Sequence, residues 1–122
     1  MSLIRSITAS VFIVFALSIT AQAITSCRPP LAPVIPDGRT APRDEILAAL
    51  KAIKNDFQPA IKNFQNCIST EKEAVGDVAT EAQTIEWDQL FDAAFMLESQ
   101  VAENMNAAIR AYKARAAAKK AE

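Results

Sequence analysis

The sequence predicts an all-α fold, an antiparallel two-helix hairpin with an extended proline-rich N-terminal arm packed along the first helix. Three observations lead to this prediction. Two long segments, 40–75 and 80–119, carry apolar residues at alternating steps of three and four, which places them on one face of a helix. Only residues 76–79 separate these segments, so the helices should fold back on each other. Four of the six prolines lie between Cys27 and Gly38, ahead of the first helix.

The segment 1–23 has the layout of a secretory signal peptide. Arg5 precedes an apolar run over 11–19, and residues 21–23 read Ala-Gln-Ala, with small side chains at both positions that signal peptidase recognises. The run is too short to span a bilayer, and no second long apolar run follows it. The mature chain is expected to begin near Ile24, in the periplasm or outside the cell, without a membrane span.

The composition argues against several classes of function. Thirteen Lys and Arg stand against 14 Asp and Glu, a net charge of −1 that gives no electrostatic basis for binding nucleic acid. The chain has no histidine, which removes the commonest general base and metal ligand. It has only two glycines, too few for a phosphate-binding loop. We therefore expect a protein that is not an enzyme and that holds no metal or cofactor.

The first helix is expected over 40–75, with Thr40 as a candidate N-cap and Gly76 at its end. Pro59 lies inside it, where a proline removes one backbone hydrogen bond and clashes with the preceding turn. A kink is therefore predicted at 55–58. The predicted apolar stripe consists of Ile46, Leu50, Ile53, Phe57, Ala60 or Ile61, Phe64, and Cys67 or Ile68.

The second helix is expected over 80–119, and Thr80 with Gln83 makes a plausible capping box at its start. Pairing Ile68 with Trp87 brings the heptad-like apolar stripes of both helices together, as in a coiled coil, although several registers would do the same. The predicted stripe consists of Trp87, Leu90 or Phe91, Ala94, Leu97, Val101, Met105, Ala108 or Ile109, and Tyr112. Basic residues fill the last turns, which suits the negative end of a helix. They are Arg110, Lys113, Arg115, Lys119 and Lys120.

The arm over 24–39 is read as a polyproline II rod. With three residues per turn, Pro30, Pro33 and Pro36 form one ridge, with Leu31 and Val34 in the next column. Such a rod could lie in the groove between two helices with little loss of entropy. The Pro-Asp-Gly sequence at its end is typical of a turn into the first helix.

Cys27 and Cys67 are expected to form a disulfide, since two cysteines in an oxidising compartment usually pair. An extended arm from Cys27 to Thr40 at ~3.1 Å per residue spans roughly 40 Å. The helix from Thr40 to Cys67 at ~1.5 Å per residue spans about the same distance. Alternatively, Ile24-Thr25-Ser26-Cys27 fits the pattern of a bacterial lipoprotein cleavage site, and Cys27 would then be lipidated.

Acidic residues gather around the predicted hairpin turn. Nine acidic residues and one lysine, Lys72, lie between Glu71 and Glu103. These charges are read either as a solvated surface, as a patch for a basic partner, or as a weak Ca²⁺ or Mg²⁺ site, although no EF-hand loop is present. The candidate partner surface consists of Glu71, Glu73, Asp77, Glu81 and Trp87.

Two apolar residues, Leu47 and Phe95, lie outside the predicted stripes. Either the arm covers them or they remain exposed on one edge, which is normal for single apolar residues. The alternative is a dimer face, through which two hairpins complete a four-helix bundle.

The region from Cys27 to residue 68 is similar to a group of small exported proteins of Gram-negative bacteria that have no assigned activity. The shared features are the cysteine before a proline-rich arm, the Ile-Pro-Asp-Gly turn at 35–38 and the Asn-Cys-Ile sequence at 66–68. The sequence departs from the group's pattern at Phe64, where a tyrosine would be expected, and at Pro59. The resemblance implies periplasmic export and a two-cysteine pattern, and it carries over no catalytic residue.

The leading interpretation is a non-enzymatic periplasmic helical hairpin that acts as an interaction or structural protein, with an unknown protein partner. A second interpretation is a bundle that binds a small molecule or lipid between its helices. The residues near that ligand would be Phe57, Phe91, Phe95 and Leu97. A third is an outer-membrane lipoprotein with the same helical body, anchored through Cys27.

Overall fold

The computed structural model describes residues 25–122. The predicted signal peptide over 1–23, its cleavage site and Ile24 lie outside the described residues. Within 25–122 no helix combines the length and the apolar character that crossing a bilayer requires.

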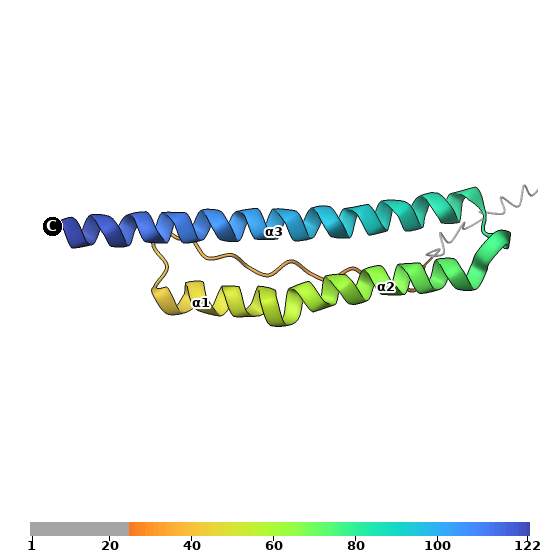
Figure 1. Cartoon of the computed structure of the whole chain (residues 1–122), viewed down its shortest axis with the longest axis horizontal. Helices are drawn as coiled ribbons and strands as arrows, with labels where there is room; N and C mark the ends of the chain where they lie inside the picture. Colours follow the sequence, from red (N-terminus) through yellow and green to blue (C-terminus); the bar gives the residue numbers. More distant parts are fainter. Residues whose placement is uncertain (1–24) are drawn as a thin grey trace, which may run out of the picture.

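The described chain forms two long helical rods that lie side by side and run in opposite directions (Figure 1). The first rod consists of α1 (Arg43–Ala52), a π-helical turn η1 (Ile53–Phe57) and α2 (Gln58–Val75). A short 3₁₀ turn, η2 (Gly76–Val78), leads into the second rod, α3 (Glu81–Ala121). No strand occurs among residues 25–122, and the prediction of an all-α fold with two packed helices is confirmed there.

The first rod changes its helical pitch just before Pro59. The π-helical turn covers Ile53–Phe57, and Pro59 then occupies the first turn of α2. A wider turn accommodates the proline ring and its missing N–H group, which a regular α-helix could not do without a clash. Ile53 and Phe57 are both buried, so the irregular turn still contributes its apolar side chains to the core.

The start of the first rod corrects the predicted N-cap. Helix α1 begins at Arg43, and the residue before it, Pro42, makes no side-chain capping hydrogen bond. Thr40 instead belongs to a tight turn, in which its backbone N–H donates to the carbonyl of Asp37 at 3.1 Å. The Asp37 carboxylate also accepts the backbone N–H of Arg39 at 2.9 Å. Asp37 therefore organises the turn and leaves Thr40 outside the helix.

The hairpin turn and the start of α3 follow the local sequence signals. Gly76 has a φ of 61°, which is favourable only for glycine. Thr80 and Gln83 form the predicted capping box, with the Gln83 N–H donating to Thr80 Oγ1 at 3.1 Å and the Thr80 N–H donating to Gln83 Oε1 at 2.9 Å. Both ends of the turn are thus fixed by residues that could be identified in advance.

The core runs along the seam between the rods. It consists of Ile46, Ala49, Ile53, Phe57, Ile61, Phe64 and Ile68 from the first rod and Trp87, Ala94, Val101, Met105 and Ala108 from α3, with Cys27 and Ala41. Trp87 lies near Ile68, with which it lines one hollow, and its indole N–H donates to Glu71 one turn further along α2. Apolar stripes of this kind match at several registers, so the turn and the polar contacts beside it decide among them.

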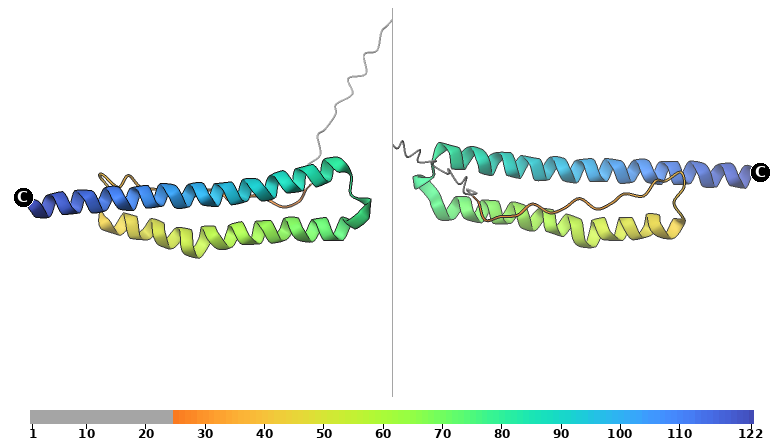
Figure 2. Two further views of the ribbon diagram at one scale, coloured as in Figure 1. Left: turned by 45° about the horizontal axis from the view of Figure 1, so that its top comes forward. Right: turned by 180° about the vertical axis from the view of Figure 1, so that it is seen from behind.

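Residues 25–36, ahead of α1, contain neither helix nor strand. Figure 2 shows this segment in front of the groove between the rods in one view and behind α3 in the other, so it lies on one side of the pair. Leu31 and Val34 are 92% and 90% exposed. The buried or half-buried positions in this segment include Cys27, Pro30, Pro33 and Pro36, which recur at every third residue.

Candidate functional site

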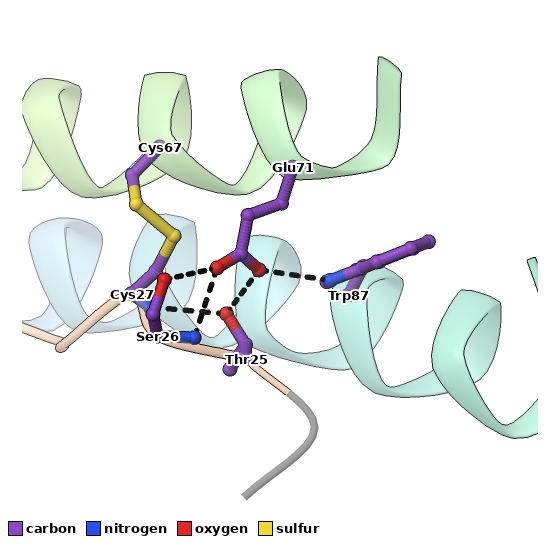
Figure 3. Close-up of a disulfide and its surroundings, with 6 residues drawn as sticks. All are labelled: Thr25, Ser26, Cys27, Cys67, Glu71 and Trp87. Atoms are coloured by element: carbon purple, nitrogen blue, oxygen red, sulfur yellow. Dashed lines mark hydrogen bonds between the residues drawn. A yellow bond between two sulfur atoms is a disulfide. The ribbon is translucent and has the colours of Figure 1, made fainter. Parts of the chain in front are cut away.

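A disulfide joins the start of the described chain to the middle of α2. Cys27 and Cys67 are bonded, with their Cα atoms 5.9 Å apart and 40 positions apart in sequence (Figure 3). Cys27 is 7% exposed, so its half of the bridge belongs to the core. The structure thus brings together the two residues that the sequence predicted as partners.

Glu71 lies one helical turn after Cys67 and holds the residues just before Cys27. Its carboxylate accepts hydrogen bonds from the hydroxyls of Thr25 and Ser26, each at 2.5 Å, and from the Ser26 backbone N–H at 2.8 Å (Figure 3). The indole N–H of Trp87 donates a further bond at 3.2 Å. One carboxylate therefore connects the N-terminal segment, α2 and α3.

These donors stabilise the charged form of Glu71. The hydroxyls of Ser26 and Thr25, followed by the Ser26 N–H and the Trp87 indole, lower the pKa of Glu71 from 4.5 to about 2, although partial burial acts in the opposite direction. The carboxylate consequently remains ionised, and remains a hydrogen-bond acceptor, at every pH near neutrality. A carboxylate of such low pKa is poorly suited to general acid–base catalysis.

The Glu71 network was not predicted, although the sequence holds a signal for it. Thr25 and Ser26 directly precede Cys27, while Glu71 follows Cys67 by one helical turn. Once the two cysteines are paired, a carboxylate at that position must lie close to the residues before Cys27. In the sequence, Thr25 and Ser26 stand out only as part of a possible lipoprotein cleavage motif, and that interpretation does not include a role as hydrogen-bond donors.

The residues of the predicted partner surface fall into two groups, one engaged within the fold and one exposed. Trp87 is 1% exposed and Glu71 is engaged within the fold, so their inclusion in a docking surface is corrected. Glu73, Asp77 and Glu81 are exposed. These three residues remain a candidate acidic surface.

One cluster of potential metal ligands includes the disulfide itself. Among residues 25–122, one group of three has ligand atoms within 4.8 Å of one another, and it consists of Cys27, Cys67 and Glu71. Its two sulfur atoms are bonded to each other, and its carboxylate is occupied by hydrogen bonds. The acidic residues of the hairpin turn form no such group within the described chain.

The four residues considered for a ligand site lie in different surroundings, and one of them, Leu97, is half-buried against the core. Phe57 is 4% exposed and belongs to the core, whereas Phe95 is 63% exposed on α3. Phe91 lines an open hollow of about 360 Å³ together with charged residues that include Lys72 and Asp88, which form an ion pair at 2.8 Å. The geometry thus separates an apolar core from a mixed, solvent-exposed surface.

The other end of the N-terminal segment is held by Arg115 of α3. Its guanidinium donates to the backbone carbonyls of Arg39 at 3.1 Å and Ala41 at 2.5 Å, and it lies over the ring of Tyr112 at 5.2 Å. The sequence had assigned Arg115 only to the negative end of the helix. It also fixes the turn that precedes α1.

No protein-family model, curated protein or solved structure matches the chain.

Proposed function

We propose that the protein is a non-enzymatic helical-hairpin protein with an interaction or structural role, exported to an oxidising compartment, the periplasm. Its N-terminal arm acts as a polyproline strap that closes one side of the helix pair. The observation that carries the proposal is the double attachment beside Cys27, through the disulfide to Cys67 and through the hydrogen bonds to Glu71.

The burial pattern of the arm supports a polyproline II conformation. Cys27, Pro30, Pro33 and Pro36 are buried or half-buried, and the spacing of three matches one turn of such a helix. Leu31, one position after Pro30, is 92% exposed. An arm with this period presents one ridge of side chains to the groove and another to solvent.

A strap of this kind meets a specific need of a two-helix protein. Two helices bury one stripe each, and a core of this size is close to the lower limit for a stable domain. The loop closed by Cys27 and Cys67 spans 40 positions, and the loss of chain entropy in the unfolded state corresponds to about 4 kcal/mol. A protein that depends on this bond is suited to a compartment in which disulfides persist.

The disulfide also bears on the lipoprotein alternative. Lipidation requires the Sγ atom of Cys27 as its attachment point, and the bond to Cys67 occupies that atom. The same cysteine cannot carry both modifications. The bridge therefore supports an unanchored exported protein over one held in the outer membrane through Cys27.

The interaction role is assigned to the face of α3 that carries large exposed apolar side chains. Phe95 and Met96 are 63% and 69% exposed, and Phe91 is 40% exposed one turn earlier. Exposed aromatic groups that cluster on a rigid helix are typical of a protein–protein contact. Because the arm and its attachments use other residues, this face is available to a partner.

Two measurements on protein from its native host test the proposal. The intact mass of the mature protein should equal that of a chain beginning near Ile24 with one disulfide and no lipid. A mass that includes acyl chains, or two thiols free to react with an alkylating reagent, would refute the strapped, unanchored form.

The interaction role is tested in the same cells with a photo-crosslinking amino acid at position 95. We expect a defined cross-linked protein species from position 95 and none from Gln89, an exposed polar position on the same helix. Equal, diffuse cross-linking at both positions, or none at either, would contradict a specific contact through this face.

A further inference from the structure

We propose that the partner on this face is a second copy of the chain, and that the two α3 helices pack against each other in antiparallel orientation. This inference rests on the proposed interaction function and names its partner. It is carried by two features of α3, an exposed aromatic pair and a separation of charge along the helix.

The aromatic pair marks where the contact lies. Phe91 and Phe95 are one helical turn apart and are 40% and 63% exposed, and Met96 adjoins them at 69%. They lie in the N-terminal half of α3. A contact that buries them must cover that half and leave the disulfide and the Arg115 attachments undisturbed.

The charge separation determines the orientation. From Glu81 to Glu103 helix α3 contains six acidic residues and no basic one, and from Arg110 to Lys120 it contains five basic residues and no acidic one. Two parallel copies would align like charges along their whole length. Two antiparallel copies place each acidic half against the basic half of its partner, which is favourable throughout.

Each half places an exposed charge, Asp92 or Arg110, on the same face of the helix. Asp92 and Arg110 are eighteen positions apart, as are Phe95 and Lys113, and eighteen residues complete about five helical turns. All four residues are exposed. In an antiparallel pair centred near residue 101, Asp92 of one copy faces Arg110 of the other, and Phe95 lies beside this charge pair, one turn away along the helix.

A second copy fits this pattern better than an unrelated protein because the complementarity lies within one surface. In a two-fold interface every contact occurs twice, so a patch must match itself after rotation. An acidic half and a basic half on a single straight helix satisfy that condition. Arg115 does not contribute, since it is engaged with the carbonyls of Arg39 and Ala41.

The test of association uses the mature, disulfide-bonded chain in sedimentation velocity over a range of concentrations. We expect a dimer that dissociates as salt is raised, because screening weakens the charge contacts. Phe95→Ser should raise the dissociation constant at least about tenfold, since each dimer loses two aromatic groups. Leu31→Ser, at a comparably exposed site on the arm, should leave it unchanged. Circular dichroism verifies that both variants remain helical.

The test of orientation exchanges the charges of one pair. Asp92→Arg and Arg110→Asp alone should each raise the dissociation constant by about tenfold, because each places like charges together twice. The double variant should recover most of the native affinity. In a parallel dimer Asp92 faces its own copy, so reversing it would leave the affinity unchanged and would overturn the antiparallel arrangement.

The outcomes separate this inference from the proposed function. A protein that is monomeric at every concentration overturns the dimer. If that monomer still forms a specific cross-link from position 95 in cells, the interaction function stands with a different partner. If the cross-link is also absent, both proposals fail.

Discussion

The carboxylate of Glu71 accepts both the backbone N–H and the hydroxyl of Ser26, at 2.8 and 2.5 Å, across a separation of 45 positions in the sequence. This contact lies beside the disulfide. The disulfide alone would let the N-terminal segment rotate about it, and the hydrogen bonds from Ser26 to Glu71 fix the orientation of that segment. The bridge limits how far the arm can move from α2. The carboxylate limits how the arm is oriented there.

Replacing Glu71 with glutamine should therefore destabilise the protein, although the two side chains have nearly the same size. The neutral amide has one acceptor oxygen, and its NH₂ group would face donors, so several hydrogen bonds to a charged group are lost together. We expect a loss of about 1–2 kcal/mol in the free energy of unfolding, because the half-buried site is partly screened by water. Urea unfolding of the oxidised protein measures this loss.

Glu73 supplies the matched control, since it is acidic, exposed and two positions away on the same helix. Glu73→Gln should change the free energy of unfolding by less than about 0.5 kcal/mol. Equal effects of the two substitutions would mean that general charge, rather than the bonds to Thr25 and Ser26, determines the stability.

The low pKa of Glu71 predicts a specific pH dependence of stability. Its pKa is about 2 in the folded protein against 4.5 ordinarily, so the unfolded chain takes up the proton first as the pH falls. The stability that this carboxylate contributes is fully present above about pH 5 and declines progressively at lower pH. Unfolding free energies of the native protein and of Glu71→Gln should converge as the pH falls from 5 toward 2.

The variant serves as the baseline, because its amide does not titrate. Other carboxyl groups affect both proteins equally and cancel in the difference. A difference that is constant over this pH range would show that Glu71 has a similar pKa in both states and that the hydrogen bonds do not favour its charged form.

The helices and the pairing of Cys27 with Cys67 could be predicted because they follow from local spacing and chain length. Apolar periodicity depends on neighbouring residues, and the capping box of Thr80 and Gln83 involves residues three apart. The kink before Pro59 was predicted for the same reason. The π-helical form of this turn was not predicted, because the sequence shows that Pro59 lacks an N–H group but does not show how the preceding turn adjusts to it.

The features that escaped prediction depend on atoms from distant parts of the chain. Trp87 was placed on a partner surface, but its indole N–H needs an acceptor when buried and finds one in Glu71. Thr40 was expected to cap α1, but it lies in the turn that Arg115 of α3 holds through the carbonyls of Arg39 and Ala41, and α1 begins only at Arg43. In both cases the local pattern does not contain a hydrogen bond to a residue far away in the sequence.

The disulfide should account for a large share of the total stability. Reduction, or replacement of Cys27 and Cys67 together by serine, removes the constraint on a loop of 40 positions, which corresponds to about 4 kcal/mol in the unfolded state. We expect the urea midpoint to fall sharply in the presence of a reductant. The serine variant is the control, because the reductant should leave its midpoint unchanged.

A midpoint that is equal in oxidised and reduced protein would contradict the role of the disulfide in stabilising the strapped fold. It would mean that the contacts of Pro30, Pro33 and Pro36 hold the arm without help, or that the arm contributes little to the folded state. Hydrogen exchange of the Ser26 amide, which donates to Glu71, separates these two cases.

The turn that precedes α1 should be intolerant of a side chain at Gly38. A Cβ atom built on Gly38 would overlap the backbone carbonyl of Ala108 in α3, and a backbone atom cannot rotate away as a flexible side chain can. Gly38→Ala must therefore lift the turn from α3 and strain the bonds from Arg115 to the carbonyls of Arg39 and Ala41. We expect a loss of about 1–3 kcal/mol in the free energy of unfolding.

Ala32→Val is the control for this substitution, because it enlarges an exposed residue of the same arm. It should change the unfolding free energy by less than about 0.5 kcal/mol. Replacing Arg115 by lysine in the Gly38→Ala background should cost less than in the native protein, since the lifted turn has already lost part of those contacts. Fully additive effects would show that Gly38 and Arg115 hold the turn independently.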